Sequence, residues 1–98
     1  MKKDEAKKYL ARVSDDKVFW VNNGPVLRSL EDLEANLHSM SEQAYSYHAN
    51  KDRNDFSNWI GAVIGDKLLA MDLTSARNKE SAHKKVKNRI HSLKKMAN

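Results

Sequence analysis

The sequence predicts a mostly α-helical fold, a compact bundle of about five helices with one small β-hairpin near residues 18–27. Two observations lead to this prediction. Apolar residues recur at helical spacing over most of the chain, and one short run of β-branched and aromatic residues is followed at once by turn-forming residues. The 98 residues correspond to one domain, so we expect residues 1–98 to form a single domain with one modest core.

The first predicted element is a helix over about residues 4–13. Ala6, Tyr9, Leu10 and Val13 are spaced so that they share one face of a helix. This face is expected to pack on the rest of the protein.

The hairpin is predicted from the segment that follows. Residues 18–21 read Val-Phe-Trp-Val, a composition typical of a strand. Asn22-Asn23-Gly24-Pro25 comes next, and Asn and Gly tolerate the positive φ that tight turns require. Pro25 lacks an amide donor, so the returning strand should be short or lie at an edge. An isolated hairpin is barely stable in water, so we expect this one to pack on helices.

Further helices are predicted between residues 29 and 73. Ser29 resembles a helix cap with an acid three residues later, and the chain is expected to kink near 39–42 and resume. Gly65 suits a helix end, and Asp66 can begin a short helix. The strongest apolar stripe lies before Gly65 and consists of Phe56, Trp59, Ile60, Val63 and Ile64.

The last predicted helix, about residues 75–97, opens at Thr74 or Ser75 and carries the basic charge. Residues 75–98 hold eight Lys or Arg and one acid, a net charge of +7, whereas the first 74 residues hold ten basic and twelve acidic residues. Cationic side chains in a row can follow phosphates, although a solvated outer face is the simpler interpretation. The candidate polyanion-binding residues are Lys84, Lys85, Lys87, Arg89, His91 and Lys95.

No catalytic residue, cofactor or metal site is predicted. The chain has no cysteine, which excludes disulfides, thiolate zinc sites and cysteine nucleophiles. Glu34 and His38 are four residues apart, but two ligands do not make a metal site. Only His48 and Asp55 could be nominated for acid–base chemistry. His48 lies among aromatic residues and is expected to be a buried, hydrogen-bonded structural histidine.

Four aromatic residues have two interpretations. Phe19, Trp20, Phe56 and Trp59 could form a surface on which a ligand stacks. The chain has only two Trp, three Tyr and two Phe, so we favour the alternative that these four side chains form the core.

Residues 18–73 contain Tyr45-Ser46-Tyr47-His48, then Asn54-Asp55-Phe56-Ser57-Asn58-Trp59-Ile60, then Val63-Ile64-Gly65-Asp66-Lys67-Leu68-Leu69-Ala70. This string resembles a small, mainly archaeal family of unknown function with the pattern HxN…NDFxxWI…VxGDxxLA. The resemblance implies a compact helical module with no assigned activity. The positions that it marks are His48, Asn50, Asp55, Trp59 and Asp66, and it implies no chemical role for them.

The function that the sequence favours is a non-enzymatic protein-interaction module in the cytoplasm, with a protein partner. The alternative is a nucleic-acid or ribosome-associated binder that uses the basic C-terminal helix to hold RNA or DNA without sequence specificity. No membrane partner is expected, because the longest apolar stretch, residues 59–64, is far short of the ~20 residues that a membrane span needs.

Overall fold

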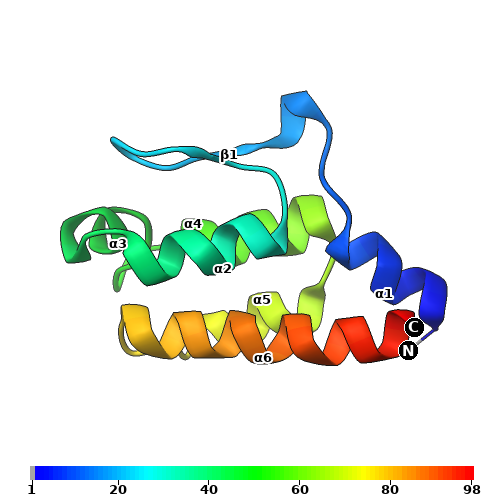
Figure 1. The fold of residues 1–98 in the computed structure, drawn as a ribbon. Helices are drawn as coiled ribbons and strands as arrows, with labels where there is room; N and C mark the ends of the chain where they lie inside the picture. Colours follow the sequence, from blue (N-terminus) through cyan, green and yellow to red (C-terminus); the bar gives the residue numbers. More distant parts are fainter. Residues whose placement is uncertain (1) are drawn as a thin grey trace.

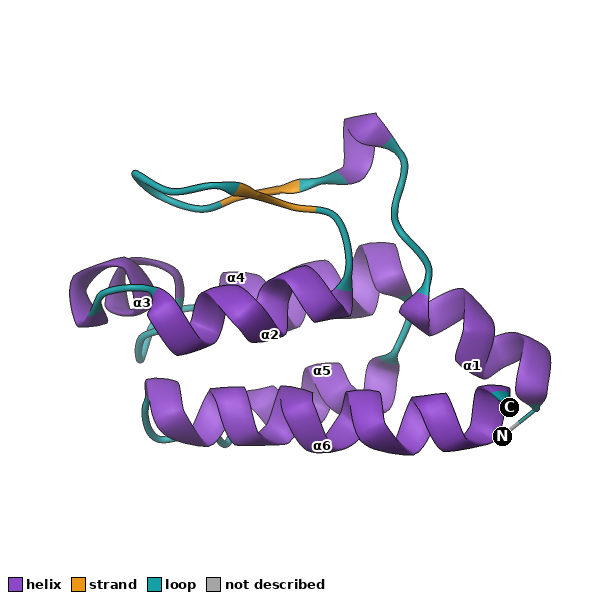
Figure 2. Ribbon diagram, in the orientation of Figure 1, coloured by secondary structure: helices purple, strands orange, loops and turns teal. Residues whose placement is uncertain are grey.

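The computed structural model describes residues 2–98 and shows a mostly helical protein with one small antiparallel sheet (Figure 1). Figure 2 shows how little of the chain is strand. The predicted fold class is confirmed. In chain order the elements are α1 (Lys3–Leu10), η1 (Asp15–Lys17), β1 (Phe19–Trp20), β2 (Val26–Leu27), α2 (Leu30–Ser39), α3 (Glu42–His48), α4 (Asp55–Trp59), η2 (Ile60–Ile64), α5 (Lys67–Leu73) and α6 (Lys79–Ala97).

The long helix α6 organises the fold. It packs against α1, α2 and α5, and the hairpin lies on the side of α2 away from α6 (Figure 1). The inward face of α6 consists of Ala82, Val86, Ile90 and Leu93, all buried and spaced at three or four residues. Among residues 2–98, no helix combines the length and the apolar character that crossing a membrane requires.

Polar side chains fix where most helices begin. Each helix from α2 to α6 starts at a residue whose side chain accepts a hydrogen bond from a backbone N–H in the first turn. The predicted starts at Ser29 and Asp66 are confirmed, and the predicted kink near residues 39–42 is the break between α2 and α3. The capping residues are Ser29, Ser41, Asn54, Asp66 and Asn78.

The predicted start of the last helix is wrong. α6 begins at Lys79, after a cap at Asn78, rather than near residue 75. The hydroxyl of Thr74 donates to the carbonyl of Met71 at 2.6 Å, and the hydroxyl of Ser75 donates to that of Asp72 at 2.9 Å. These two hydroxyls therefore complete the end of α5 instead of opening α6.

The first helix is also shorter than predicted. α1 ends at Leu10, and the N–H of Val13 donates to the carbonyl of Arg28 at 2.7 Å. Val13 thus leaves the helix to pair with the segment after the hairpin. The apolar side chains that were predicted to face inward still do so, because Ala6 is buried and Tyr9 and Leu10 pack against the core.

The hairpin corrects one core prediction. Phe19 pairs with Leu27, and Trp20 pairs with Val26. Successive strand residues point to opposite faces, so Phe19 and Leu27 are buried while the Trp20 side chain is 73% exposed. Trp20 is therefore not a core residue. Phe19, by contrast, packs among the buried rings of Phe56 and Trp59, with ring centroids 5.0 and 5.8 Å away.

The apolar stripe after residue 55 is confirmed, with one change of geometry. α4 continues into η2, a π-helical turn, and both present buried apolar side chains to the core. The π-helical turn ends in a hydrogen bond that the N–H of Gly65 donates to the carbonyl of Ile60 at 2.7 Å. Gly65 has φ of 94°, in the left-handed region that favours glycine, as its predicted role at a helix end requires.

Candidate docking groove and basic face

The cationic side chains of α6 divide among three faces of the helix. On the face toward α2 they are all engaged. Lys94 pairs with Glu31 at 3.3 Å, and His83 contacts Glu34 at 2.5 Å. The ammonium group of Lys79 donates to two carbonyl oxygens near the end of α2, each at 3.2 Å. These contacts attach α6 to α2 and leave little free charge on this face.

The face toward α5 holds a buried ion pair. The guanidinium of Arg89 donates to both carboxylate oxygens of Asp66, at 2.7 and 2.9 Å. Asp66 is only 1% exposed, and the same carboxylate caps α5 by accepting from the N–H of Leu69. Nearby, burial raises the pKa of the Tyr9 hydroxyl, and the negative charges of Glu5 and Asp66 add to the rise. Asp66 and Arg89 thus join α5 to α6.

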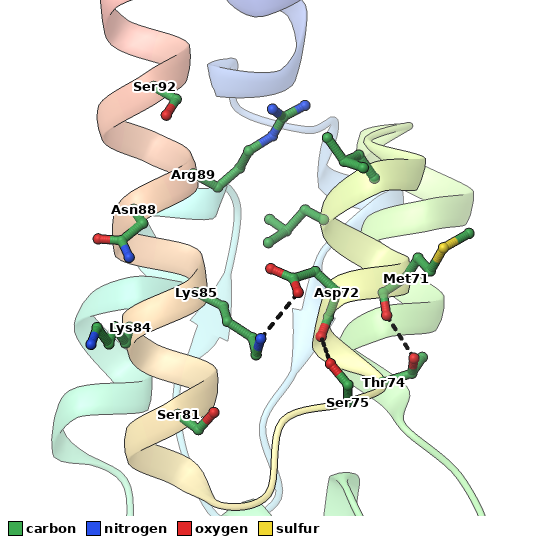
Figure 3. Close-up of a pocket in the computed structure, with 12 residues that line it drawn as sticks. Met71, Asp72, Thr74, Ser75, Ser81, Lys84, Lys85, Asn88, Arg89 and Ser92 are labelled. Carbon is green, nitrogen blue, oxygen red and sulfur yellow. Dashed lines mark hydrogen bonds and ion pairs between the residues drawn. The ribbon is translucent and has the colours of Figure 1, made fainter.

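Two of the predicted polyanion-binding residues therefore form ion pairs with acids at the start of α5 or within it. Arg89 is held by Asp66, and the ammonium group of Lys85 pairs with Asp72 at 3.0 Å. Figure 3 shows Lys85 reaching from α6 across to Asp72. Asp72 and Asp66 precede Lys85 and Arg89 by 13 and 23 residues in the sequence, so these pairings depend on how α5 packs against α6.

The outer face of α6 carries what we call the basic row: Lys84, Lys87, His91 and Lys95. All four side chains are exposed, as the helical spacing predicts. None of them forms an ion pair with an acid of residues 2–98. Of the six predicted polyanion-binding residues, these four are the ones that face solvent.

A groove with a volume of about 880 Å³ runs between α5 and α6 (Figure 3). Its α5 side presents Leu68 and Met71, which are 64% and 71% exposed. The two side chains lie three residues apart and so share one face of the helix. The α6 side is polar and cationic, and consists of Ser81, Lys84, Lys85, Asn88, Arg89 and Ser92. Sequence reasoning assigned no role to Leu68 or Met71 and did not identify this groove.

The positions marked by the family pattern lie away from the groove, apart from Asp66, and hold loops and helices together. Asn50 accepts from the N–H of Asp52 and donates to the carbonyl of Ser46, which orders the loop between α3 and α4. The indole N–H of Trp59 donates to the carbonyl of Lys17 at 2.8 Å. Each of the five side chains that the pattern marks makes a hydrogen bond within the protein.

His48 is buried and hydrogen-bonded, as predicted. Its Nε2 accepts from the backbone N–H of Asn22 at 2.9 Å, and its Nδ1 lies 3.0 Å from the Asp55 carboxylate. With Nδ1–H donating to Asp55, both ring nitrogens have partners. The buried ring also contacts Phe19 edge-on, at 4.9 Å between centroids. The residue therefore fastens the hairpin turn to α3 and α4.

Replacing His48 by Ala is expected to lower the free energy of unfolding by about 1–3 kcal/mol, because the N–H of Asn22 loses its acceptor and the carboxylate of Asp55, which Arg53 also contacts at 3.4 Å, loses its bond to the ring. Urea unfolding measures this loss. His38→Ala is the control, since His38 is exposed and makes no side-chain hydrogen bond among residues 2–98. Equal unfolding midpoints for the two variants would show that His48 does not hold the hairpin.

Among residues 2–98, no three His, Asp or Glu side chains gather as they would around a metal ion. Glu34 lies against His83 of α6 rather than sharing a site with His38 of its own helix. The rings of His38 and His83 are 5.4 Å apart. This cluster therefore serves as a contact between α2 and α6.

No family model, no curated protein and no solved structure matches this chain. The resemblance to a small archaeal family therefore stays a prediction, and the functional argument rests on the groove and the basic face.

Proposed function

We propose that this protein is a non-enzymatic interaction module of the cytoplasm whose groove between α5 and α6 binds an acidic amphipathic helix of a protein partner. One observation carries the proposal: Leu68 and Met71 expose most of their apolar surface at the groove, whereas Leu69 and Leu73 of the same helix are buried. Adjacent exposed apolar side chains beside a groove are typical of interaction sites.

The charge of the groove indicates which partner fits. Its lining contains three cations, Lys84, Lys85 and Arg89, and one acid, Asp72. A partner segment with glutamates or aspartates would complement this excess of positive charge. Within residues 2–98, Lys84 is the free cation of the set, because Lys85 contacts Asp72 of α5 and Arg89 contacts Asp66, the cap of α5.

The apolar side of the groove suits a helix. Amphipathic helices insert side chains spaced at three and four residues into grooves, and Leu68 and Met71 offer contacts at that spacing. A methionine side chain is unbranched and polarisable, so it adapts to partners of different shape. The partner's apolar face would cover Leu68 and Met71 while its acids meet α6.

A designed helical peptide of about 15 residues tests this function. The probe carries leucines on one face and glutamates elsewhere, and is titrated into ¹⁵N-labelled protein. We expect amide shifts concentrated in α5 and the groove side of α6. Leu68→Gln combined with Met71→Gln should weaken binding about tenfold or more.

Trp20→Gln is the matched control, since it removes a comparably exposed apolar side chain far from the groove. It should leave the affinity unchanged, and a peptide with lysines in place of the glutamates should not bind. Equal affinity for the groove variant and the wild type would refute the proposal. A dimer that depends on Leu68 and Met71 in light scattering would refute it too, because a second copy would then fill the groove.

A further inference from the structure

The charge of this protein is divided between two parts of the fold. Residues 2–12 and 75–98 contain thirteen Lys or Arg and three acids, whereas residues 13–74 contain five Lys or Arg and ten acids. The two basic segments come from opposite ends of the chain. The structure joins them, because α1 packs against α6 and the start of α1 lies beside the end of α6 (Figure 1).

The cations of α1 are free, like those of the basic row. The five cationic side chains near this helix are all exposed, and none forms an ion pair with an acid of residues 2–98. They are Lys2, Lys3, Lys7, Lys8 and Arg12. Free cations therefore lie on α1 as well as on α6, which the charge count of the C-terminal segment alone did not indicate.

We propose that the basic row of α6, together with the cations of α1, binds the phosphate backbone of a nucleic acid. Lys84 and Lys95 are separated by about 16 Å along α6, at the usual rise of about 1.5 Å per residue. Lysines along this length can each meet a phosphate and displace counterions from it. This function shares Lys84 with the groove but requires neither Leu68 nor Met71.

The binding is indifferent to sequence. Arginine is the side chain that most often reads base edges, and Arg89, the arginine of α6, is held by both oxygens of Asp66. Lysine ammonium groups act on phosphates as point charges. The contacts left on the basic row are therefore those that position a nucleic acid and not those that identify bases.

A duplex is the favoured form of the ligand. Proteins that prefer single strands stack bases on exposed aromatic rings. The largely exposed aromatic residues, Trp20 and Tyr47, lie on the hairpin and on α3 rather than on α1 or α6. Duplexes carry the higher charge density and should bind more tightly than single strands on charge alone.

Fluorescence anisotropy with a labelled DNA duplex, an RNA duplex and a single strand tests the proposal between about 50 and 200 mM salt. We expect binding at the lower salt concentration that weakens steeply as salt rises, with the duplexes bound more tightly than the single strand. Replacing Lys84, Lys87 and Lys95 by Gln should reduce the slope of log affinity against log salt by about 2–3 for DNA. Lys3→Gln with Lys7→Gln should reduce it by about 2.

The matched control removes three charges from the acidic part of the chain, where Lys17, Lys51 and Lys67 are also exposed. Changing these three to Gln should leave the slope unchanged. Replacing the row lysines by Arg keeps the charges, so both the fold and the binding should be kept. A loss of binding in the Arg variant as well would show that substitution at these positions disturbs the fold.

Three results would overturn the proposal. They are no binding of any probe at about 50 mM salt, an equal loss in the control variant, and binding of polyglutamate as tightly and with the same slope as the duplexes. The last result would assign the basic face to an acidic protein. The Leu68→Gln and Met71→Gln variant should bind nucleic acid normally, so this test and that of the groove can fail separately.

Discussion

Replacing Trp59 by Ala is expected to lower the free energy of unfolding by about 3–5 kcal/mol. The Trp59 ring is buried and packs edge-on against Phe19. Its indole N–H also donates to the carbonyl of Lys17, which connects α4 to the segment before the hairpin. The variant loses apolar burial, leaves a cavity and removes this bond. Domains of this size are stable by only about 5–15 kcal/mol, so the effect is a large fraction of the total.

Urea unfolding followed by circular dichroism measures the change, and the midpoint should fall with little change in slope. Trp20→Ala is the control of identical chemistry, because it removes the same side chain from the exposed face of the hairpin. Its effect should stay within about 0.5 kcal/mol. If both variants unfold at the same urea concentration, Trp59 is not part of the core.

The contrast between the two tryptophans shows what local patterns predict. Apolar spacing on a helix identified Trp59 as a core residue, because the stripe from residues 56 to 64 has only one way to face inward. Composition alone placed Trp20 in the core as well. Neighbouring strand residues point to opposite faces, so a strict alternation argument applied to Phe19 and Trp20 would have buried only one of them.

Helix ends were predictable where a single residue decides them. Ser29 and Asp66 cap their helices through contacts three residues away, and Gly65 adopts a conformation that few other residues share. The start of α6 was harder, because Thr74, Ser75 and Asn78 all have side chains that bond to a nearby backbone. Which of them caps the helix depends on how far α5 extends.

The candidate site was predictable on the outer face of α6 and not elsewhere. The spacing of Lys84 and Lys95 fixes them opposite the buried stripe, whatever packs beneath. The engagement of Arg89 depends on Asp66, which α5 supplies from another part of the chain. The groove depends on the same packing. Only the inward side of the short helix α5 contacts the core, and this leaves Met71 in solvent.

Arg89→Met is expected to lower the free energy of unfolding by about 3–5 kcal/mol. The guanidinium of Arg89 satisfies both oxygens of an Asp66 carboxylate that is almost completely buried. Without Arg89, the bond from the N–H of Leu69 is the one that this carboxylate retains among residues 2–98. An unpaired charge in such a place is costly because water no longer solvates it.

A double-mutant cycle separates this loss from a general effect of the substitution. Asp66→Asn keeps an acceptor for the N–H of Leu69 and removes the charge. In the Asp66→Asn background, Arg89→Met should therefore cost much less than it does alone. Urea unfolding of the wild type, the two single variants and the double variant gives the coupling energy.

Lys85→Met is the matched control on the same helix. It removes the ion pair with Asp72, whose carboxylate is half-exposed, so its cost should be at most about 1 kcal/mol. If Arg89→Met costs no more than Lys85→Met, water reaches the Asp66 carboxylate and Arg89 is an exchangeable surface cation. Arg89 would then be available to phosphates, as its place in the sequence first indicated, and the basic row would gain the arginine that base readout requires.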